Sequence, residues 1–130
     1  MPGYLLDSNI GIYLLANDES VTNFLRKITG EGASFFFSAI SECEIRNNLR
    51  PGEHLRADRL LIERRILVVD SKVAQRAAQL QLSQRANSRS IKTPDALILA
   101  TALENELSFV SRDKQLRFAQ LEYGLEFIEP

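Results

Sequence analysis

The sequence predicts an α/β fold in which a mostly parallel, five-stranded sheet is sandwiched by helices. Short apolar runs bounded by polar or turn residues alternate along the chain with segments of helical spacing. The first four runs are almost continuously apolar, which suits strands buried on both faces. Strands that alternate with helices indicate βαβ units and hence a parallel sheet. With 130 residues and 45% hydrophobic side chains, the chain is the size of one domain, over residues 1–130.

Strands and helices are expected at regular intervals, separated by turns rich in glycine and proline. The expected strands are 4–6, 34–37, 66–69, 107–110 and 125–128. The last of these alternates in polarity, so we expect it at an edge of the sheet. The expected helices are one that begins near Asn9 and those at 20–28, 39–49, 53–64, 71–87, 94–105 and 113–120.

Charge and cysteine content limit the classes of protein to consider. The formal net charge is −1, from 16 basic and 17 acidic residues, so no overall positive field draws in nucleic acid. Cys43 is the only cysteine, which excludes a disulfide or a zinc thiolate cluster within one chain and favours the reducing cytoplasm. The apolar N-terminal segment lacks the basic start of a signal peptide, and no run approaches the roughly 20 apolar residues of a membrane span.

Acidic side chains occur where the predicted strands end. Asp7 directly follows strand 4–6, and Asp113 comes shortly after strand 107–110. In an open α/β sheet, ligands bind in the crevice beyond the carboxyl ends of the strands. Asp7 and Asp113 can therefore face one crevice.

Two further acids belong to helices that can reach the same crevice. Asp95 opens helix 94–105, and Glu44 lies on helix 39–49. Glu42 and Arg46 on that helix form an i,i+4 pair, which leaves Glu44 on a different face.

Each acid also has an ordinary structural explanation. Asp7 can form an Asx turn or cap the next helix, and Asp113 is also a plausible cap. Asp95 follows Thr93-Pro94, where a negative charge favours the helix start, and Glu44 can be a helix-surface acid. No single residue proves a site.

Together, the four carboxylates Asp7, Glu44, Asp95 and Asp113 would repel one another, so a cluster of them is sensible chiefly around a cation. Mg²⁺ prefers such hard oxygen ligands, and Mn²⁺ can replace it. A bound cation can activate water against a phosphodiester, which is nuclease chemistry. The chain has neither a Ser/His/Asp or Cys/His arrangement for a covalent intermediate nor a glycine-rich phosphate loop. The residues expected to support the acids are Ser8, Asn9 and Ser111.

Four motifs, in this order, resemble those of PIN-domain proteins, particularly the VapC-type toxins of bacterial toxin–antitoxin pairs. The matching segments are Tyr4-Leu-Leu-Asp7-Ser-Asn-Ile, Ser38-Ala-Ile-Ser-Glu-Cys-Glu44-Ile, Asp95-Ala-Leu-Ile-Leu-Ala-Thr-Ala and Phe109-Val-Ser-Arg-Asp113, followed by the usual ending, Phe127-Ile-Glu-Pro130. In the second motif the acid falls three residues after Ser or Thr, which selects Glu44 over Glu42. The match spans nearly the whole chain, and the four motifs together are more specific than any one.

The resemblance implies a PIN-like parallel sheet between helices and a magnesium-dependent endoribonuclease that cleaves RNA. It implies that Asp7, Glu44, Asp95 and Asp113 are the catalytic metal ligands. It also implies a homodimer silenced by a small antitoxin whose tail enters the active-site groove. The sequence departs from the toxin pattern after Ile45, where a glycine often follows within a few residues, and this puts substrate specificity in doubt more than catalysis.

A near-neutral chain needs a local basic patch to hold RNA. The candidates that flank the acids are Arg85, Arg89, Lys92, Arg112 and Lys114. Such residues are often no more than a solvated surface.

Two alternative functions remain. A non-catalytic PIN-like module could retain the acids for contacts with RNA or protein, and metal binding would separate it from the nuclease. A phosphoacceptor receiver domain would need an adjacent acidic pair after the first strand and a lysine after a late strand. The chain has Asp7-Ser8-Asn9 and Ser111-Arg112 at those places.

Overall fold

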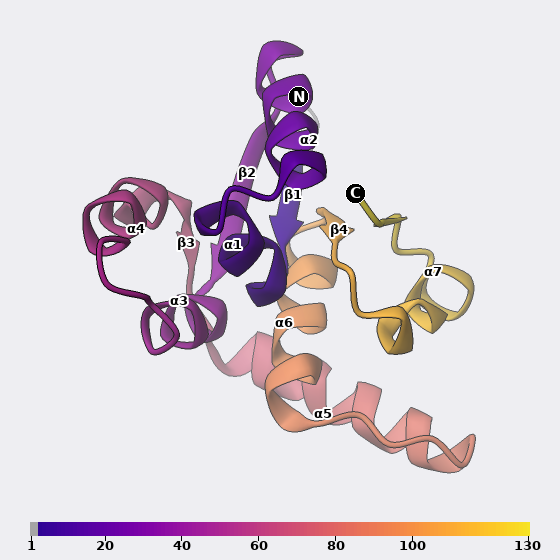
Figure 1. Ribbon diagram of the computed structural model, residues 1–130. Coiled ribbons are helices and arrows are strands. Elements are labelled where there is room, and N and C mark those ends of the chain that lie inside the picture. The colour runs from indigo at the N-terminus through magenta and orange to yellow at the C-terminus, as the bar shows by residue number, and fades with distance from the viewer. Residues whose placement is uncertain (1–2) are drawn as a thin grey trace.

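The computed structural model describes residues 3–130, whose five strands form one parallel sheet in the order β3-β2-β1-β4-β5 (Figure 1). The strands are β1 (Gly3–Leu6), β2 (Ser34–Ser38), β3 (Ile66–Leu67), β4 (Ser108–Val110) and β5 (Phe127–Ile128). This arrangement confirms the predicted parallel sheet and the edge position of the last strand. The third and last strands, predicted at 66–69 and 125–128, are each two residues shorter than predicted.

The helices also follow the predicted order, with different ends in three places. They are α1 (Ser8–Leu15), α2 (Glu19–Gly30), α3 (Ala39–Arg46), α4 (His54–Leu60), α5 (Ser71–Ala86), α6 (Thr93–Glu104) and α7 (Phe118–Tyr123), with short 3-10 helices η1 (Glu63–Arg65) and η2 (Lys114–Leu116). Across residues 3–130, none of them combines the length and the apolar character needed to cross a membrane.

Side-chain hydrogen bonds to backbone groups account for the shorter helices. Asn48 donates to the carbonyl of Glu44 at 2.8 Å, at the end of α3, which was predicted to reach residue 49. The predicted helix 53–64 stops at Leu60, whose carbonyl accepts from Arg65 at 3.1 Å. The predicted helix 113–120 is divided into η2 and α7, because the Asp113 carboxylate caps a separate short turn.

The core lies on both faces of the sheet, because neighbouring strand residues point in opposite directions. Leu5 belongs to the cluster that includes Leu80 of α5 and Leu99 of α6. Leu6 belongs to the other cluster, with Ile10 of α1 and residues of α2 and α4. Helices therefore cover both faces, as the almost continuous apolar strands predict.

Close packing between α1 and α3 depends on Gly11. A Cβ atom at this position would collide with Cδ1 of Ile45 and lie 3.2 Å from Cε1 of Phe37. Gly11, Ile45 and Phe37 are all buried, so little space exists for relief. The missing side chain lets the first half of α1 approach the C-terminal end of α3 closely.

The sheet grows outward in both directions from β1, which lies between β2 and β4. The chain adds β2 and β3 on one side, then returns to place β4 and β5 on the other. Such a reversal of strand order opens a crevice beyond the carboxyl ends of the strands. Asp7 directly follows β1, and the segment from Ser111 to Asp113 directly follows β4. Both stand at this reversal.

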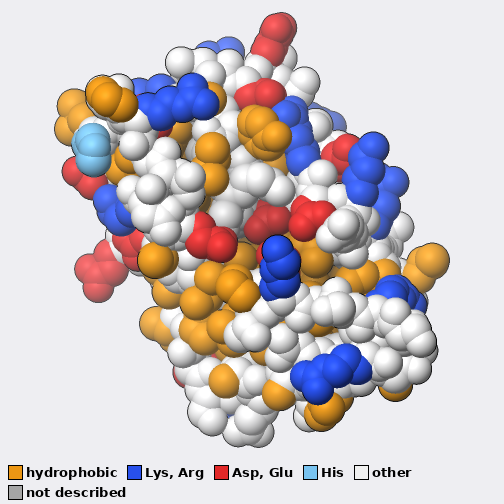
Figure 2. All heavy atoms as spheres, turned by 60° about the horizontal axis from the view of Figure 1, so that its bottom comes forward, with side chains coloured by type: hydrophobic (Ala, Val, Ile, Leu, Met, Phe, Trp, Pro, Cys, Tyr) orange, Lys and Arg blue, Asp and Glu red, His pale blue; other side chains and the backbone are white. Residues whose placement is uncertain are grey.

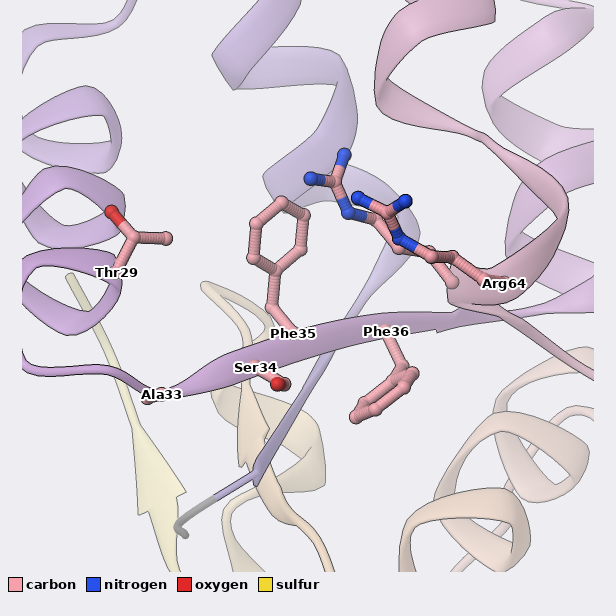
Figure 3. A pocket seen from close by; sticks show the side chains of 7 residues that line it. Thr29, Ala33, Ser34, Phe35, Phe36 and Arg64 are labelled. Atoms are coloured by element: carbon pink, nitrogen blue, oxygen red, sulfur yellow. The ribbon is translucent and has the colours of Figure 1, made fainter.

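The opposite end of the sheet carries a different kind of hollow (Figure 3). It has a volume of about 220 Å³ and is lined by the start of β2, by Thr29 of α2 and by Arg64 and Arg65 of η1. The guanidinium carbon of Arg65 lies 4.3 Å from the ring centre of Phe35. Because it lies where β2 begins, this basic and aromatic hollow is separate from the acids that follow the strand ends.

Candidate active site

Asp7 is buried and held in place through both carboxylate oxygens. Its Oδ1 accepts from the backbone N–H of Ser8 at 2.8 Å, and its Oδ2 accepts from the hydroxyl of Ser111 at 2.6 Å. Burial raises the pKa of the carboxyl from 3.8 to about 6, the two serine hydrogen bonds oppose this rise, and the charges of Asp95 and Asp113 add to it. Asp7 does cap α1, as the ordinary explanation suggests, yet it also keeps an unfavourably buried charge.

Glu44 is also anchored by a serine rather than exposed as an ordinary surface acid. The half-buried Glu44 carboxylate accepts from the Ser8 hydroxyl at 2.5 Å. Ser8 Oγ lies 3.0 Å from Ser41 Oγ, and both serines are buried. Ser8 thus joins α1 to α3. Ser41 is the serine three residues before Glu44 in the second motif, but it is not among the supporting residues predicted from the sequence.

Asp95 and Asp113 reach the same site from the other side. Burial raises the pKa of the half-buried Asp95 carboxyl, the charges of Asp113 and Glu44 raise it further, and Lys92 lowers it. The Asp113 carboxylate accepts from the backbone N–H of Gln115 at 3.0 Å, so it caps η2 as well. The four predicted acids therefore share one electrostatic environment, although they come from four separate segments.

The donor set fits a hard divalent cation in its chemistry, although the carboxylates are not drawn together. No three acidic, histidine or cysteine side chains within residues 3–130 are placed to hold one metal ion jointly. Mg²⁺ commonly uses only one or two protein carboxylates and completes its shell with water and substrate phosphate. Neighbouring negative charges help to raise the pKa of Asp7 and of Asp95, and a bound cation would relieve this repulsion. We therefore regard these residues as suited to Mg²⁺ or Mn²⁺.

The other predicted supporting residue, Asn9, also lies in the site. Its amide nitrogen is 3.4 Å from Asp7 Oδ2 and 3.5 Å from Ser111 Oγ. Its amide oxygen accepts from the backbone N–H of Arg112 at 3.4 Å. Asn9 thus connects the start of α1 to the segment after β4.

The five basic residues predicted to hold RNA differ in their surroundings. Arg89 is paired with Glu122 at 2.7 Å, and Arg112 with Asp18 at 2.9 Å, so both charges are already balanced. Lys92 is exposed and acts on Asp95, while Arg85 and Lys114 are exposed. Figure 2, which views the end of the molecule toward which β1 runs, shows acidic side chains gathered in the middle of this face and basic ones around them.

Residues 4–122 match the family model of the PIN domain, and the chain belongs to this family. The fold is also that of several solved structures. A chain of FitAcB from Neisseria gonorrhoeae matches with 27% identity and a TM-score of 0.75, and the alignment covers 96% of each chain. No curated protein matches the sequence.

Two more distant solved structures share the fold at 17% identity. One is VapBC2 from Rickettsia felis bound to a promoter DNA fragment, with a TM-score of 0.78 and 98% of each chain covered. The other is VapBC-5 from Mycobacterium tuberculosis, a member of the VapBC family of toxin–antitoxin systems, with a TM-score of 0.73 and 100% of each chain covered. These two comparisons bear on the fold alone.

Proposed function

We propose that this protein is a metal-dependent endoribonuclease and the toxin of a toxin–antitoxin pair. The observation that carries the proposal is a group of acids at the carboxyl edge of a PIN-domain sheet, in which the charges of Asp95 and Asp113 act on Asp7, and those of Asp113 and Glu44 act on Asp95. Carboxylates at the point where strand order reverses are placed for a ligand in the crevice. A burial cost such as that of Asp7 commonly marks a functional site.

Each side chain has a role in this proposal. Asp7 and Asp95, with Glu44 and Asp113, would hold Mg²⁺ or Mn²⁺. When bound, such a cation supplies a water of lowered pKa and neutralises charge on the phosphodiester. Ser111 fixes the orientation of Asp7, and Ser8 fixes that of Glu44. Hydrolysis by water needs no covalent intermediate, in agreement with the absence of an activated nucleophile among these residues.

The toxin assignment is supported by membership of the PIN-domain family and by the four motifs that resemble those of VapC-type toxins. By the same resemblance, the protein would form a homodimer and bind a small antitoxin. A cytoplasmic location follows from an RNA substrate and agrees with a single, exposed cysteine, Cys43. These parts of the proposal can fail separately from the nuclease activity.

Cleavage of RNA by the purified protein is the first test. We expect cutting with Mg²⁺ or Mn²⁺ and none with EDTA. Asp95→Asn should remove cutting and weaken Mn²⁺ binding measured by calorimetry, while the circular dichroism spectrum stays unchanged. Absence of both cutting and metal binding in the wild-type protein would instead support the non-catalytic binding module.

Two glutamates on α3 provide a matched pair of variants. Glu44→Gln should lower the cleavage rate by more than the roughly 10- to 100-fold that loss of an outer-shell partner of a metal site causes. Glu42→Gln should leave it unchanged, because Glu42 pairs with Arg46 at 3.0 Å on another face. Equal effects of the two substitutions would contradict the assignment of Glu44.

The toxin and dimer assignments need separate measurements. Expression of the protein should arrest growth, and co-expression of the small protein encoded beside its gene should restore it. Asp95→Asn should remove the growth arrest. Sedimentation of the purified protein should give the mass of a dimer, and a monomer that still cuts RNA would contradict only that part.

A further inference from the structure

Arg112 is prevented by its hydrogen bonds from acting as a simple phosphate contact. Its Nη1 and Nη2 donate to the two carboxylate oxygens of Asp18, each at 2.9 Å, and its Nε donates to the carbonyl of Pro130 at 3.2 Å. A bidentate arginine–carboxylate pair is strong and fixes the orientation of the guanidinium plane. Most of the charge that could attract a phosphate is therefore balanced within the protein.

One face of the same guanidinium covers an aromatic ring. The Cζ atom of Arg112 lies 4.6 Å from the ring centre of Tyr13, which is on α1 and 39% exposed. Arg112 itself keeps 23% of its side chain accessible. The hydrogen bonds hold the guanidinium plane in place against the ring, and both side chains stay partly accessible, so the stacked pair offers a planar surface to a ligand. Arg112 and Tyr13 together form a fixed stack, here named the Arg112–Tyr13 platform.

The platform stands beside the four acids. The backbone N–H of Arg112 donates to Asn9, whose amide nitrogen is 3.4 Å from Asp7 Oδ2. The residues on either side of Arg112 are Ser111, which donates to Asp7, and Asp113. The platform and the carboxylates are therefore linked through one short segment of chain, so a base on the platform and a phosphodiester at the carboxylates could belong to the same RNA strand.

We propose that the Arg112–Tyr13 platform is a nucleobase-stacking subsite that holds an unpaired base of the RNA next to the cleaved phosphodiester. Proteins recognise unstacked bases on aromatic rings and on guanidinium planes, and every base has a π-face that fits. A balanced charge on a rigid plane is suited to a base rather than to a phosphate. This inference rests on the proposed function and adds which side chains hold the base beside the cleaved bond.

Binding of RNA to the Asp95→Asn protein, which should not cut, gives the test. The probes are a fluorescent single-stranded RNA and a series in which one position at a time is abasic. Arg112→Lys keeps the positive charge but loses the plane. We expect it to weaken binding of the intact RNA about 5- to 150-fold, the equivalent of the roughly 1–3 kcal/mol that one stacked base contributes.

The abasic series separates stacking from other roles. At one position, removal of the base should weaken binding to the Arg112 protein by the same factor, and Arg112→Lys should then have no further effect. Loss of a structural contact would weaken binding of all the RNAs equally. Loss of a phosphate contact would do so too and would reduce the dependence of log Kd on log salt by about 0.7 per contact. Either result would overturn the proposal.

Two further variants complete the test: one is a control for the loss of any arginine, and the other is an alternative if Arg112→Lys does not fold. Arg117→Lys is the matched control, since Arg117 also pairs with a carboxylate, at 3.3 Å, and has its guanidinium carbon 5.8 Å from an aromatic ring centre. It should bind every RNA as the Asp95→Asn protein does. Tyr13→Leu, on the exposed side of α1, should reproduce a smaller, base-dependent loss if Arg112→Lys does not fold.

The result also distinguishes the inference from the function on which it rests. If the wild-type protein cuts RNA but Arg112→Lys and Tyr13→Leu bind as the parent does, the subsite is wrong and the nuclease stands. If the wild-type protein neither binds nor cuts any RNA, both proposals fail.

Discussion

The two sides of the carboxylate site differ in how firmly they hold their acids. On the α1–α3 side, Asp7 and Glu44 each accept a hydrogen bond from a serine hydroxyl. On the α6–η2 side, the Asp95 carboxylate accepts none from residues 3–130, and Asp113 accepts one from a backbone N–H. One side is thus arranged in advance, whereas the other keeps the freedom to adjust to a cation. Under the proposed function, the first side would orient the cation ligands and the second would capture the cation.

The largest effect on cleavage is expected when the α1–α3 side of the site loses the negative charge of Asp7. Asp7→Asn should reduce cleavage by more than about 100-fold, beyond the loss of an outer-shell partner. The amide can still accept from Ser8 and donate to Ser111, so the fold should be kept. Removal of the buried charge should also raise the free energy of unfolding of the metal-free protein by about 1–3 kcal/mol at neutral pH. Urea denaturation in EDTA measures this gain, and a loss of stability would contradict our account of Asp7.

The pH dependence of the metal-free protein should show the same burial cost. The pKa of Asp7 is about 6 when folded, against an ordinary value of 3.8. Between these values the folded chain holds a proton that the unfolded chain has released, so unfolding becomes easier as the pH rises. Stability should therefore fall by roughly 1–3 kcal/mol from pH 4 to pH 7.

The control for this prediction is the Asp7→Asn protein, measured over the same range. Asp18 contributes in the opposite sense, because its hydrogen bond with Arg112 lowers the pKa of the Asp18 carboxyl. That stability is present above the ordinary pKa and is lost as the pH falls through the folded value. The difference between the two proteins isolates Asp7, and parallel curves would contradict the raised pKa.

A smaller effect on cleavage is expected when Asp7 keeps its charge but loses a hydrogen bond that holds it. Ser111→Ala deletes the hydroxyl that donates to Asp7 at 2.6 Å. Cleavage should fall by about 10- to 100-fold, as is usual for partners that orient a metal ligand. Titration with Mn²⁺ should give a larger dissociation constant, because the metal is bound more weakly. Ser90→Ala, in the exposed loop before α6, is the control. An unchanged rate would mean that Asp7 does not need its anchor.

The smallest expected effect is a change in backbone mobility on the α6–η2 side of the site. Addition of Mg²⁺ should slow amide hydrogen exchange at the start of α6, around Asp95, several-fold more than in α1, which the serines already hold. Mass spectrometry of peptides from both helices compares them in one sample. Equal protection in the two helices would remove the proposed distinction between orientation and capture.

The sequence predicts the sheet correctly, and it also indicates where the four acids lie in the fold, because both depend on short-range patterns. The catalytic role of the acids stays a prediction. Apolar runs show the strands, and the position of Asp7 directly after one of them shows which end of the sheet it reaches. The predicted helices were less accurate where a side chain ends them, as Asn48 does for α3 and Arg65 for α4. Such caps depend on a single rotamer that periodicity does not report.

Long-range pairs explain what the sequence could not show. Arg112 looks like a free cation beside Asp113, but its partner Asp18 is 94 residues away in the chain. Arg89 is likewise paired with Glu122, 33 residues further on. Which cations remain available to RNA is therefore a property of the folded surface. The role of Ser41 also depends on a contact across 33 residues, with Ser8.

Gly11 determines how far apart α1 and α3 lie, and this separation must be right for a contact in the site. Its missing side chain sets how closely α1 can approach Ile45 of α3. Ser8, one turn earlier on α1, must span that separation to reach Glu44. A methyl group added at residue 11 would push α1 and α3 apart and so lengthen the distance between Ser8 and Glu44. Its effect would reach the carboxylates through the contact between Ser8 and Glu44, although residue 11 itself packs against Ile45 and Phe37.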